Sequence, residues 1–169
     1  MMEQGNLSTD NFELWRSLRS AEMDFFSARW EFLSRSTDKQ LTIKQALKSP
    51  SDRTTALRIL LYLEVEERLS FFDQLVDLAS VGHSDIELVR EVILSLPKEF
   101  LLANIEKSAE PILNAADPYY QYEEYRRLLE LYIEIDLELT RRLAVRASQS
   151  EDEDIREAGE DFLELLNND

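Results

Sequence analysis

The sequence predicts an all-helical fold, and three observations support this prediction. The 169 residues contain only 3 Gly and 4 Pro, too few for the many tight turns of a β-sandwich or barrel. Hydrophobic residues make up 44% of the chain, so a domain of this length can bury a core. Apolar residues recur mostly at steps of three and four, which is the period of a helix with one buried face.

The chain is expected to form one helical domain over residues 10–169, after a disordered leader at residues 1–9. Within this domain, residues 10–49 are interpreted as N-terminal capping helices, and residues 50–169 as about three and a half helical pairs. Capping helices are needed in stacked helical arrays because a terminal unit otherwise exposes its apolar face.

The first element is a long helix that Asp10 can cap and that continues to about Arg35. Its aromatic and leucine side chains recur along most of its length, so it must pack against something. We interpret it as a cap over the next helices, and the alternative is a dimer interface formed by its aromatics. Thr42 can cap a second, short helix that ends near Leu47.

From Asp52 onward the chain looks modular, with turn residues, an apolar helix, a break and a second apolar helix. At Asp117-Pro118, an N-cap residue precedes a Pro at the first helical position, where its missing N–H costs nothing. The other expected breaks are Ser49–Asp52, Gly82–Asp85, Leu96–Pro97 and Ser148–Asp154. Self-similarity at this period indicates stacked helical pairs.

An apolar residue followed by Arg recurs a few residues after each turn. The four Arg stand 32, 36 and 30 residues apart, and each follows an acidic turn residue. The pairs are Leu57-Arg58, Val89-Arg90, Tyr125-Arg126 and Ile155-Arg156. Repeats of 30 to 40 residues with two helices each are typical of helical solenoids, in which each unit buries its face against its neighbours.

Residues 85–96, DIELVREVILSL, and 154–163, DIREAGEDFL, carry a loop Asp, an apolar-Arg pair and an apolar helix end. This pattern resembles the HEAT-repeat family over residues 50–167. The resemblance implies a right-handed α-α superhelix, that is, a HEAT-like solenoid with an N-terminal capping helix. It also implies that the repeated Asp and Arg form a structural ladder between the loops, which makes the four Arg scaffold residues.

Charge limits the partners that the chain can bind. It holds 35 acids against 19 Lys plus Arg, and residues 58–169 carry the whole net charge of −16. Nucleic acids and anionic membranes would be repelled, because binding to phosphate depends on Lys and Arg. We expect a basic protein or peptide as the partner, although the acidity could equally serve only solubility.

The chain contains no Cys, so it has neither disulfides nor thiolate metal sites. No signal peptide and no run of apolar residues long enough to cross a membrane are visible, and we expect a cytoplasmic protein. We expect a monomer or a weak homodimer.

Catalytic chemistry has little support in the sequence. The only histidine, His83, is interpreted as an exposed loop residue, and no glycine-rich phosphate loop is present. Glu130, Glu134 and Glu138 stand four apart on one helical register, which could hold a divalent cation, but a solvated face is the preferred interpretation. We assign no catalytic residue, no cofactor and no metal ligand.

Five of the six tyrosines fall in one stretch. Tyr122, Tyr125 and Tyr132 are expected to pack in the core. Tyr119 and Tyr120 lie in a first helical turn, where at least one should face outward. An exposed tyrosine among acids can anchor a basic partner, because it combines a large contact area with a polar tip.

The sequence therefore predicts a non-catalytic module that binds a basic protein or peptide through an acidic concave face. In a solenoid that face is lined by the second helices. The candidate partner-binding residues are Asp73, Asp77, Glu106, Glu110, Tyr119, Tyr120, Glu138 and Arg142. Two alternatives remain: a small acidic inhibitor or immunity protein that mimics the charge of nucleic acid, and an enzyme that uses carboxylates with a divalent metal.

Overall fold

The computed structural model describes the backbone of residues 9–114 and 118–168 and the side chains of residues 10–114 and 122–168. Over these residues the chain is all-helical, with ten helices. They are α1 (Thr9–Arg35), α2 (Lys39–Lys48), α3 (Arg53–Leu60), α4 (Val65–Leu69), α5 (Phe72–Ala79), α6 (Ile86–Leu94), α7 (Lys98–Leu113), α8 (Pro118–Ile135), α9 (Leu137–Ser148) and α10 (Glu153–Asn168). None of these helices has the length and apolar character needed to cross a membrane.

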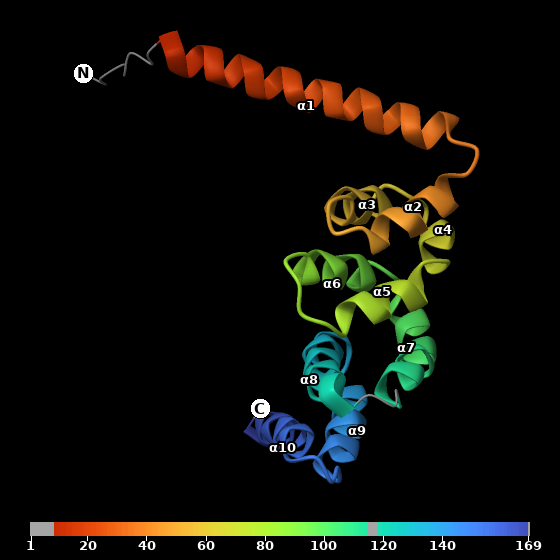
Figure 1. The fold of residues 1–169 in the computed structure, drawn as a ribbon, viewed down its shortest axis with the longest axis vertical. Coiled ribbons are helices and arrows are strands. Elements are labelled where there is room, and N and C mark those ends of the chain that lie inside the picture. The colour runs from red at the N-terminus through yellow and green to blue at the C-terminus, as the bar shows by residue number, and fades with distance from the viewer. Residues whose placement is uncertain (1–8, 115–117, 169) are drawn as a thin grey trace. The chain divides into compact units, whose positions relative to one another are not determined.

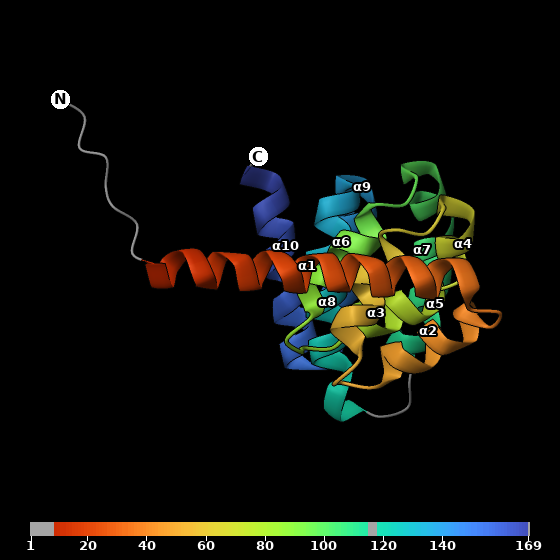
Figure 2. The same cartoon turned by 90° about the horizontal axis from the view of Figure 1, so that it is seen from above.

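The chain divides into two compact units, Met1–Ile43 and Lys44–Asp169. The first contains α1, which is one unbroken rod in both views (Figure 1, Figure 2). The predicted long helix is confirmed and ends at Arg35, but it begins at Thr9, so Asp10 lies in its first turn and does not cap it. The rest of the predicted leader lies outside the described residues. The capping role of this helix stays a prediction.

The predicted helix starts agree with the structure at most turns. Helices α3, α6, α8 and α10 begin within one residue of the predicted turn ends, and α7 begins directly after Pro97. Helix α2 differs, because it begins at Lys39. The Thr42 hydroxyl donates to the Asp38 carbonyl oxygen at 3.1 Å, so Thr42 lies inside the helix and does not cap it.

In the second unit, helices pack mostly on helices near them in the chain. Helix α3 contacts α6, α6 contacts α8, and α8 contacts α10. Helix α5 contacts α6 and α7, and α9 contacts α8 and α10. Figure 1 shows this succession running from α3 to α10. The second helix of the first module is split into α4 and α5, and a capping box between Glu64 and Glu67 starts α4.

The core of the second unit is formed by apolar residues at helical spacing. Of the tyrosines expected to pack there, Tyr125 and Tyr132 are confirmed, with exposed fractions of 7% and 1%. The Tyr132 hydroxyl donates to the Ile105 carbonyl oxygen at 3.4 Å, and burial raises the pKa of this phenol. The prediction was wrong for Tyr122, which is 37% exposed and lies beside the Arg126 guanidinium.

The expected register of Glu130, Glu134 and Glu138 on one helix was wrong. Helix α8 ends at Ile135, and Glu138 lies in the first turn of α9. Asp136 separates the two helices, because its carboxylate accepts hydrogen bonds from the Glu138 and Leu139 backbone N–H groups at 3.0 and 3.2 Å. These bonds satisfy donors that a helix start leaves free and hold the pKa of Asp136 below its usual range.

Three of the four repeated arginines bind other groups of the chain, but their contacts differ from the ladder that the family resemblance implies. Arg90 donates to Glu130 at 2.5 Å and Arg126 to Asp161 at 2.7 Å, so each reaches the first helix of the next module. Arg156 instead donates to the Ser150 carbonyl oxygen at 3.1 Å.

The loop Asp residues of that ladder bind other groups. Asp85 accepts a hydrogen bond from the Thr54 hydroxyl at 2.6 Å, and Asp152 accepts from backbone N–H groups at the start of its own helix. Arg58 is exposed. Helix-to-helix ion pairs therefore replace the expected loop ladder among the described residues.

Candidate functional site

The predicted partner-binding residues lie on three helices of the second unit. Asp73 and Asp77 belong to α5, Glu106 and Glu110 to α7, and Glu138 and Arg142 to α9. The backbone of Tyr119 and Tyr120 belongs to the first turn of α8, and their side chains lie outside the described residues. Helix α5 packs on α7, and ion pairs join α7 to α9. The acids on these helices differ in whether a basic side chain binds them.

Glu106 and Glu110 are neutralised by arginines of α9. Arg142 holds Glu106 with two hydrogen bonds of 3.0 Å each, which is the bidentate arrangement that a guanidinium favours. Arg146 donates to Glu110 at 2.7 Å and to the Asn114 side-chain oxygen at 2.9 Å. The bond from Arg146 is the main reason that the pKa of Glu110 is lowered.

The two ion pairs join α7 to α9. The bond to Glu106 raises the pKa of Arg142, and the bond to Glu110 raises that of Arg146. This stretch of the predicted acidic face therefore has balanced charge. Glu138, at the start of α9, remains largely exposed and lies 3.9 Å from the Arg141 Nε.

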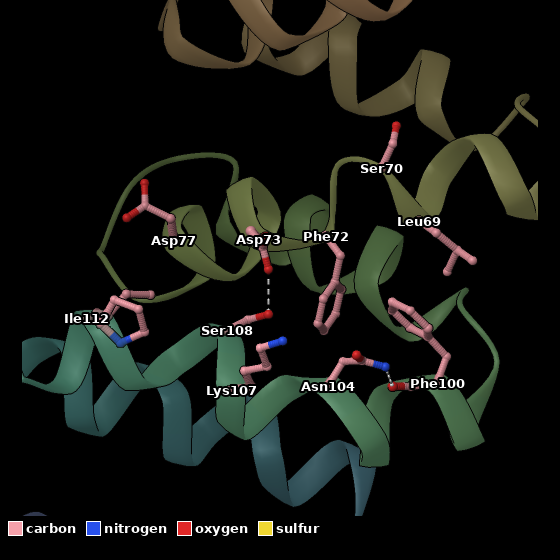
Figure 3. A pocket seen from close by; sticks show the side chains of 11 residues that line it. Leu69, Ser70, Phe72, Asp73, Asp77, Phe100, Asn104, Lys107, Ser108 and Ile112 are labelled. Atoms are coloured by element: carbon pink, nitrogen blue, oxygen red, sulfur yellow. Dashed lines mark hydrogen bonds between the residues drawn. The ribbon is translucent and has the colours of Figure 1, made fainter.

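Two of these residues, Asp73 and Asp77, line a groove between α5 and α7. Its volume is about 600 Å³. The lining residues come from α4, α5, α7 and the link between α4 and α5: Leu69, Ser70, Phe72, Asp73, Asp77, Phe100, Asn104, Lys107, Ser108, Pro111 and Ile112. Figure 3 shows the α5 side chains on one wall and the α7 side chains on the other.

The floor of the groove is aromatic. Phe72 of α5 and Phe100 of α7 meet edge to face, with ring centroids 5.0 Å apart and ring planes at 76°. Phe72 is buried, whereas Phe100 is half-buried and presents part of its ring to the groove. Asn104 holds its amide by donating to the Phe100 carbonyl oxygen at 2.8 Å, which leaves its side-chain oxygen available as an acceptor.

Three charges surround this floor. Asp73 points from α5 toward α7 and accepts a hydrogen bond from the Ser108 hydroxyl at 2.5 Å (Figure 3). Asp77, one turn later, is exposed and forms no hydrogen bond or ion pair with the described side chains. Lys107 lines the opposite wall. The groove thus combines two carboxylates, one ammonium group and an apolar floor.

Sequence reasoning found the two carboxylates of the groove and missed its floor and its Lys. It also missed that Arg146 pairs with Glu110. One signal was available, because both ion pairs between α7 and α9 join residues 36 apart, the same interval that separates Arg90 from Arg126. Aligning the modules at that interval places the acids of one second helix opposite the bases of the next.

The geometry around His83 is that of a structural residue. Its Nε2 donates to the Leu78 carbonyl oxygen at 3.0 Å, and its Nδ1 accepts from the Asp85 backbone N–H at 3.1 Å. The ring is half-buried, so the expectation of an exposed loop histidine was wrong. Both ring nitrogens therefore stabilise the turn before α6 by hydrogen bonds. Among the described residues, no group of three or more His, Asp or Glu is arranged to hold a metal ion.

Comparisons with known proteins identify no relative of this chain. No protein-family model, no curated protein and no solved structure matches it. Its function is therefore argued from the groove between α5 and α7 and from the charges around it.

Proposed function

We propose that the second unit is a non-catalytic binding module with HEAT-like stacking, and that its α5–α7 groove takes a basic peptide segment of a partner protein. The occupant is a short stretch in which Arg or Lys stands next to an aromatic or aliphatic side chain. The observation that carries the proposal is the pairing of Asp73 and Asp77 with the aromatic floor of the groove.

The stacking of the helices supports the solenoid part of the proposal. First helices contact first helices in chain order, and ion pairs join equivalent helices of successive modules. The α7–α9 pairs extend the same relation to the second helices. Contacts between neighbouring units only are the mark of a quasi-one-dimensional fold. In such a fold the second helices form one continuous surface, which here contains the groove.

The chemistry of the groove supports a cationic ligand with an apolar neighbour. A guanidinium or ammonium group can bind the Asp77 carboxylate without first displacing a partner from it. Arg also stacks on the faces of aromatic rings, and the half-buried ring of Phe100 lines the groove. An adjacent apolar side chain would cover the remaining floor, and such buried anchors dominate binding energies.

Charge would contribute to binding both at long range and at contact. Over long distances the net charge of −16 attracts a basic partner and speeds association at low ionic strength. At contact the selectivity comes from Asp73 and Asp77, because Glu106 and Glu110 already bind Arg142 and Arg146. Lys107 partly offsets the two carboxylates, so the groove itself is only mildly acidic and depends on its floor for affinity.

A display library of random peptides, selected on the full chain at low salt, tests this proposal. We expect the selected peptides to contain Arg or Lys beside an aromatic or aliphatic residue. The double variant Asp73→Asn with Asp77→Asn should weaken their binding about tenfold or more and reduce its dependence on salt.

The matched control is Glu157→Gln with Glu160→Gln, which removes the same charge from exposed positions of α10. This control should leave peptide binding nearly unchanged. An equal loss of peptide binding in both variants would show that only net charge matters, and would reject the groove as the binding site. Loss in the α10 variant alone would favour the second candidate, an inhibitor that presents the exposed carboxylates of α10 to a nucleic-acid-binding protein.

A further inference from the structure

A second hollow, of about 570 Å³, lies along α7 next to the α5–α7 groove. It is lined by Glu106, Lys107, Glu110, Pro111 and Asn114. Lys107 and Pro111 line the groove as well, so the two depressions meet at this turn of α7. A ligand that leaves the groove across α7 therefore passes over these two residues into the second hollow.

The carboxylates of the second hollow already have cationic partners. Glu106 accepts two hydrogen bonds from Arg142, and Glu110 accepts one from Arg146 at 2.7 Å. The Asn114 amide donates to the other Glu110 oxygen at 2.6 Å, and the Asn114 side-chain oxygen accepts from Arg146 at 2.9 Å. A cationic group of a ligand would have to displace one of these arginines, and the loss of a charge-assisted hydrogen bond costs free energy.

The groove differs from this hollow, because a carboxylate is free there. Asp77 is exposed on α5 and forms no hydrogen bond or ion pair with the described side chains. Lys107 is exposed on the opposite wall, on α7 (Figure 3). A cation of the ligand is thus attracted at the α5 side of the groove and repelled by the Lys107 ammonium group where the ligand crosses α7.

The second hollow offers an apolar surface instead of a free charge. Apolar atoms form most of this surface, because the Pro111 ring and the methylene groups of the charged side chains line it. Packed helix axes are about 8–10 Å apart, and an extended peptide spans about 3.3 Å per residue. The hollow therefore lies about three to five residues along a ligand from the group that binds Asp77.

We propose that the ligand of the groove crosses α7 over Lys107 and Pro111 and places an uncharged apolar side chain in the second hollow. This inference rests on the proposed function and narrows the ligand class to a segment with a basic residue at one end and an apolar residue at the other. A second basic residue at the far end would meet Lys107, Arg142 and Arg146 and find no free carboxylate. Runs of Lys or Arg are therefore poor ligands of this site, despite the net charge of −16.

A peptide display library with a fixed Arg-Phe pair and random residues on both sides tests the inference on the full chain. In selections on the wild type, one flank should be enriched in aliphatic or aromatic residues about three to five positions from the Arg. Lys and Arg should be depleted at that far position about two- to fivefold relative to the unselected library, as expected for a like charge at a partly exposed site.

The variant Arg146→Met separates local charge from overall charge, because it frees the Glu110 carboxylate from its cationic partner. Selections on this variant should enrich Lys and Arg at the far position about two- to fivefold relative to the wild type. The matched control is Arg141→Met, which removes the same charge from the same helix and leaves the pair of Glu110 with Arg146 in place. The control should select the same peptides as the wild type.

Two results would overturn the inference. They are wild-type selections that show no preference beyond the Arg-Phe pair, and an equal shift toward Lys and Arg in both arginine variants. In either case the proposed function would stand if Asp73→Asn with Asp77→Asn still weakened the binding of the Arg-Phe peptides. If no Arg-Phe peptide binds the wild type, the proposed function fails and this inference fails with it.

Discussion

Arg90 is the most deeply buried charged side chain among the described residues that form ion pairs, with 10% of its side chain exposed. It donates to Glu130 of α8 at 2.5 Å, while Arg127 donates to the same carboxylate at 3.0 Å. Burial raises the pKa of Glu130, but the hydrogen bonds from Arg90 and Arg127 outweigh it, and the net pKa is lowered. Glu130 therefore stabilises the contact between α6 and α8 in its charged form.

Replacing Glu130 by Gln should destabilise the second unit at neutral pH by roughly 1.5–3 kcal/mol, because a buried guanidinium loses its charged acceptor. The lowered pKa of Glu130 determines how its contribution to stability depends on pH. The contribution of Glu130 is fully present above its ordinary pKa of 4.5, and it is lost as the pH falls through the lower pKa of the folded state. The measurement is urea unfolding of the wild type and of Glu130→Gln across this pH range. The role would be contradicted if the difference between their free energies of unfolding did not become smaller as the pH falls.

At the scale of single residues, the sequence predicts burial better than it predicts partners. Tyr125 and Tyr132 follow the apolar period of α8 and are buried, whereas Tyr122 follows the same period one turn too early and is exposed. Partners are harder to predict, because an ion pair between modules depends on which helices stack. The sequence shows that Arg90 is part of a repeat, but only the packing of α6 on α8 identifies Glu130 as its acceptor.

At the scale of elements, the contact between α9 and α10 depends on one glycine. Gly159 of α10 faces the backbone of α9 so closely that a Cβ atom there would lie 2.6 Å from the Ala144 carbonyl oxygen and 2.9 Å from the Ala147 carbonyl carbon. It would also clash with the Ser148 backbone nitrogen. Backbone atoms cannot rotate away as the end of a side chain can, so the two helices would have to separate.

We expect Gly159→Ala to lower the free energy of unfolding by about 1–3 kcal/mol, as overpacking in a tight contact does. Gly82→Ala is the matched control. A Cβ atom at Gly82 would meet chiefly the Glu123 carboxylate, a flexible side-chain end, so its cost should be smaller. Chemical unfolding of both variants gives the comparison, and equal losses would argue against a close backbone contact at Gly159.

Helix ends marked by Gly, Pro or a turn cluster were predictable, and the break between α8 and α9 was not. The start of α8 at Pro118 follows from the fixed φ of proline, and the start of α10 follows from a run of acids. The stretch around Asp136 contains good helix formers on both sides, so its periodicity predicts one continuous helix. The tertiary fold selects Asp136 as an N-cap, and this choice moves Glu138 off the face of Glu130.

At the scale of the molecule, all described side chains that are buried and apolar lie between Ile43 and Phe162. Helix α1 contributes none of them, although its sequence is rich in aromatic residues. The stability of the monomer should therefore reside in the helices from α2 onward. Ile43 and Leu47 of α2 are buried, so a fragment that preserves the core must keep this helix.

A fragment of residues 37–169 should therefore fold without α1 and unfold cooperatively, with a free energy of unfolding within about 0.5 kcal/mol of that of the full chain. Chemical unfolding of the fragment and the full chain, followed by far-ultraviolet circular dichroism at the same protein concentration, is the measurement. A fragment without a cooperative transition would show that α1 belongs to the core.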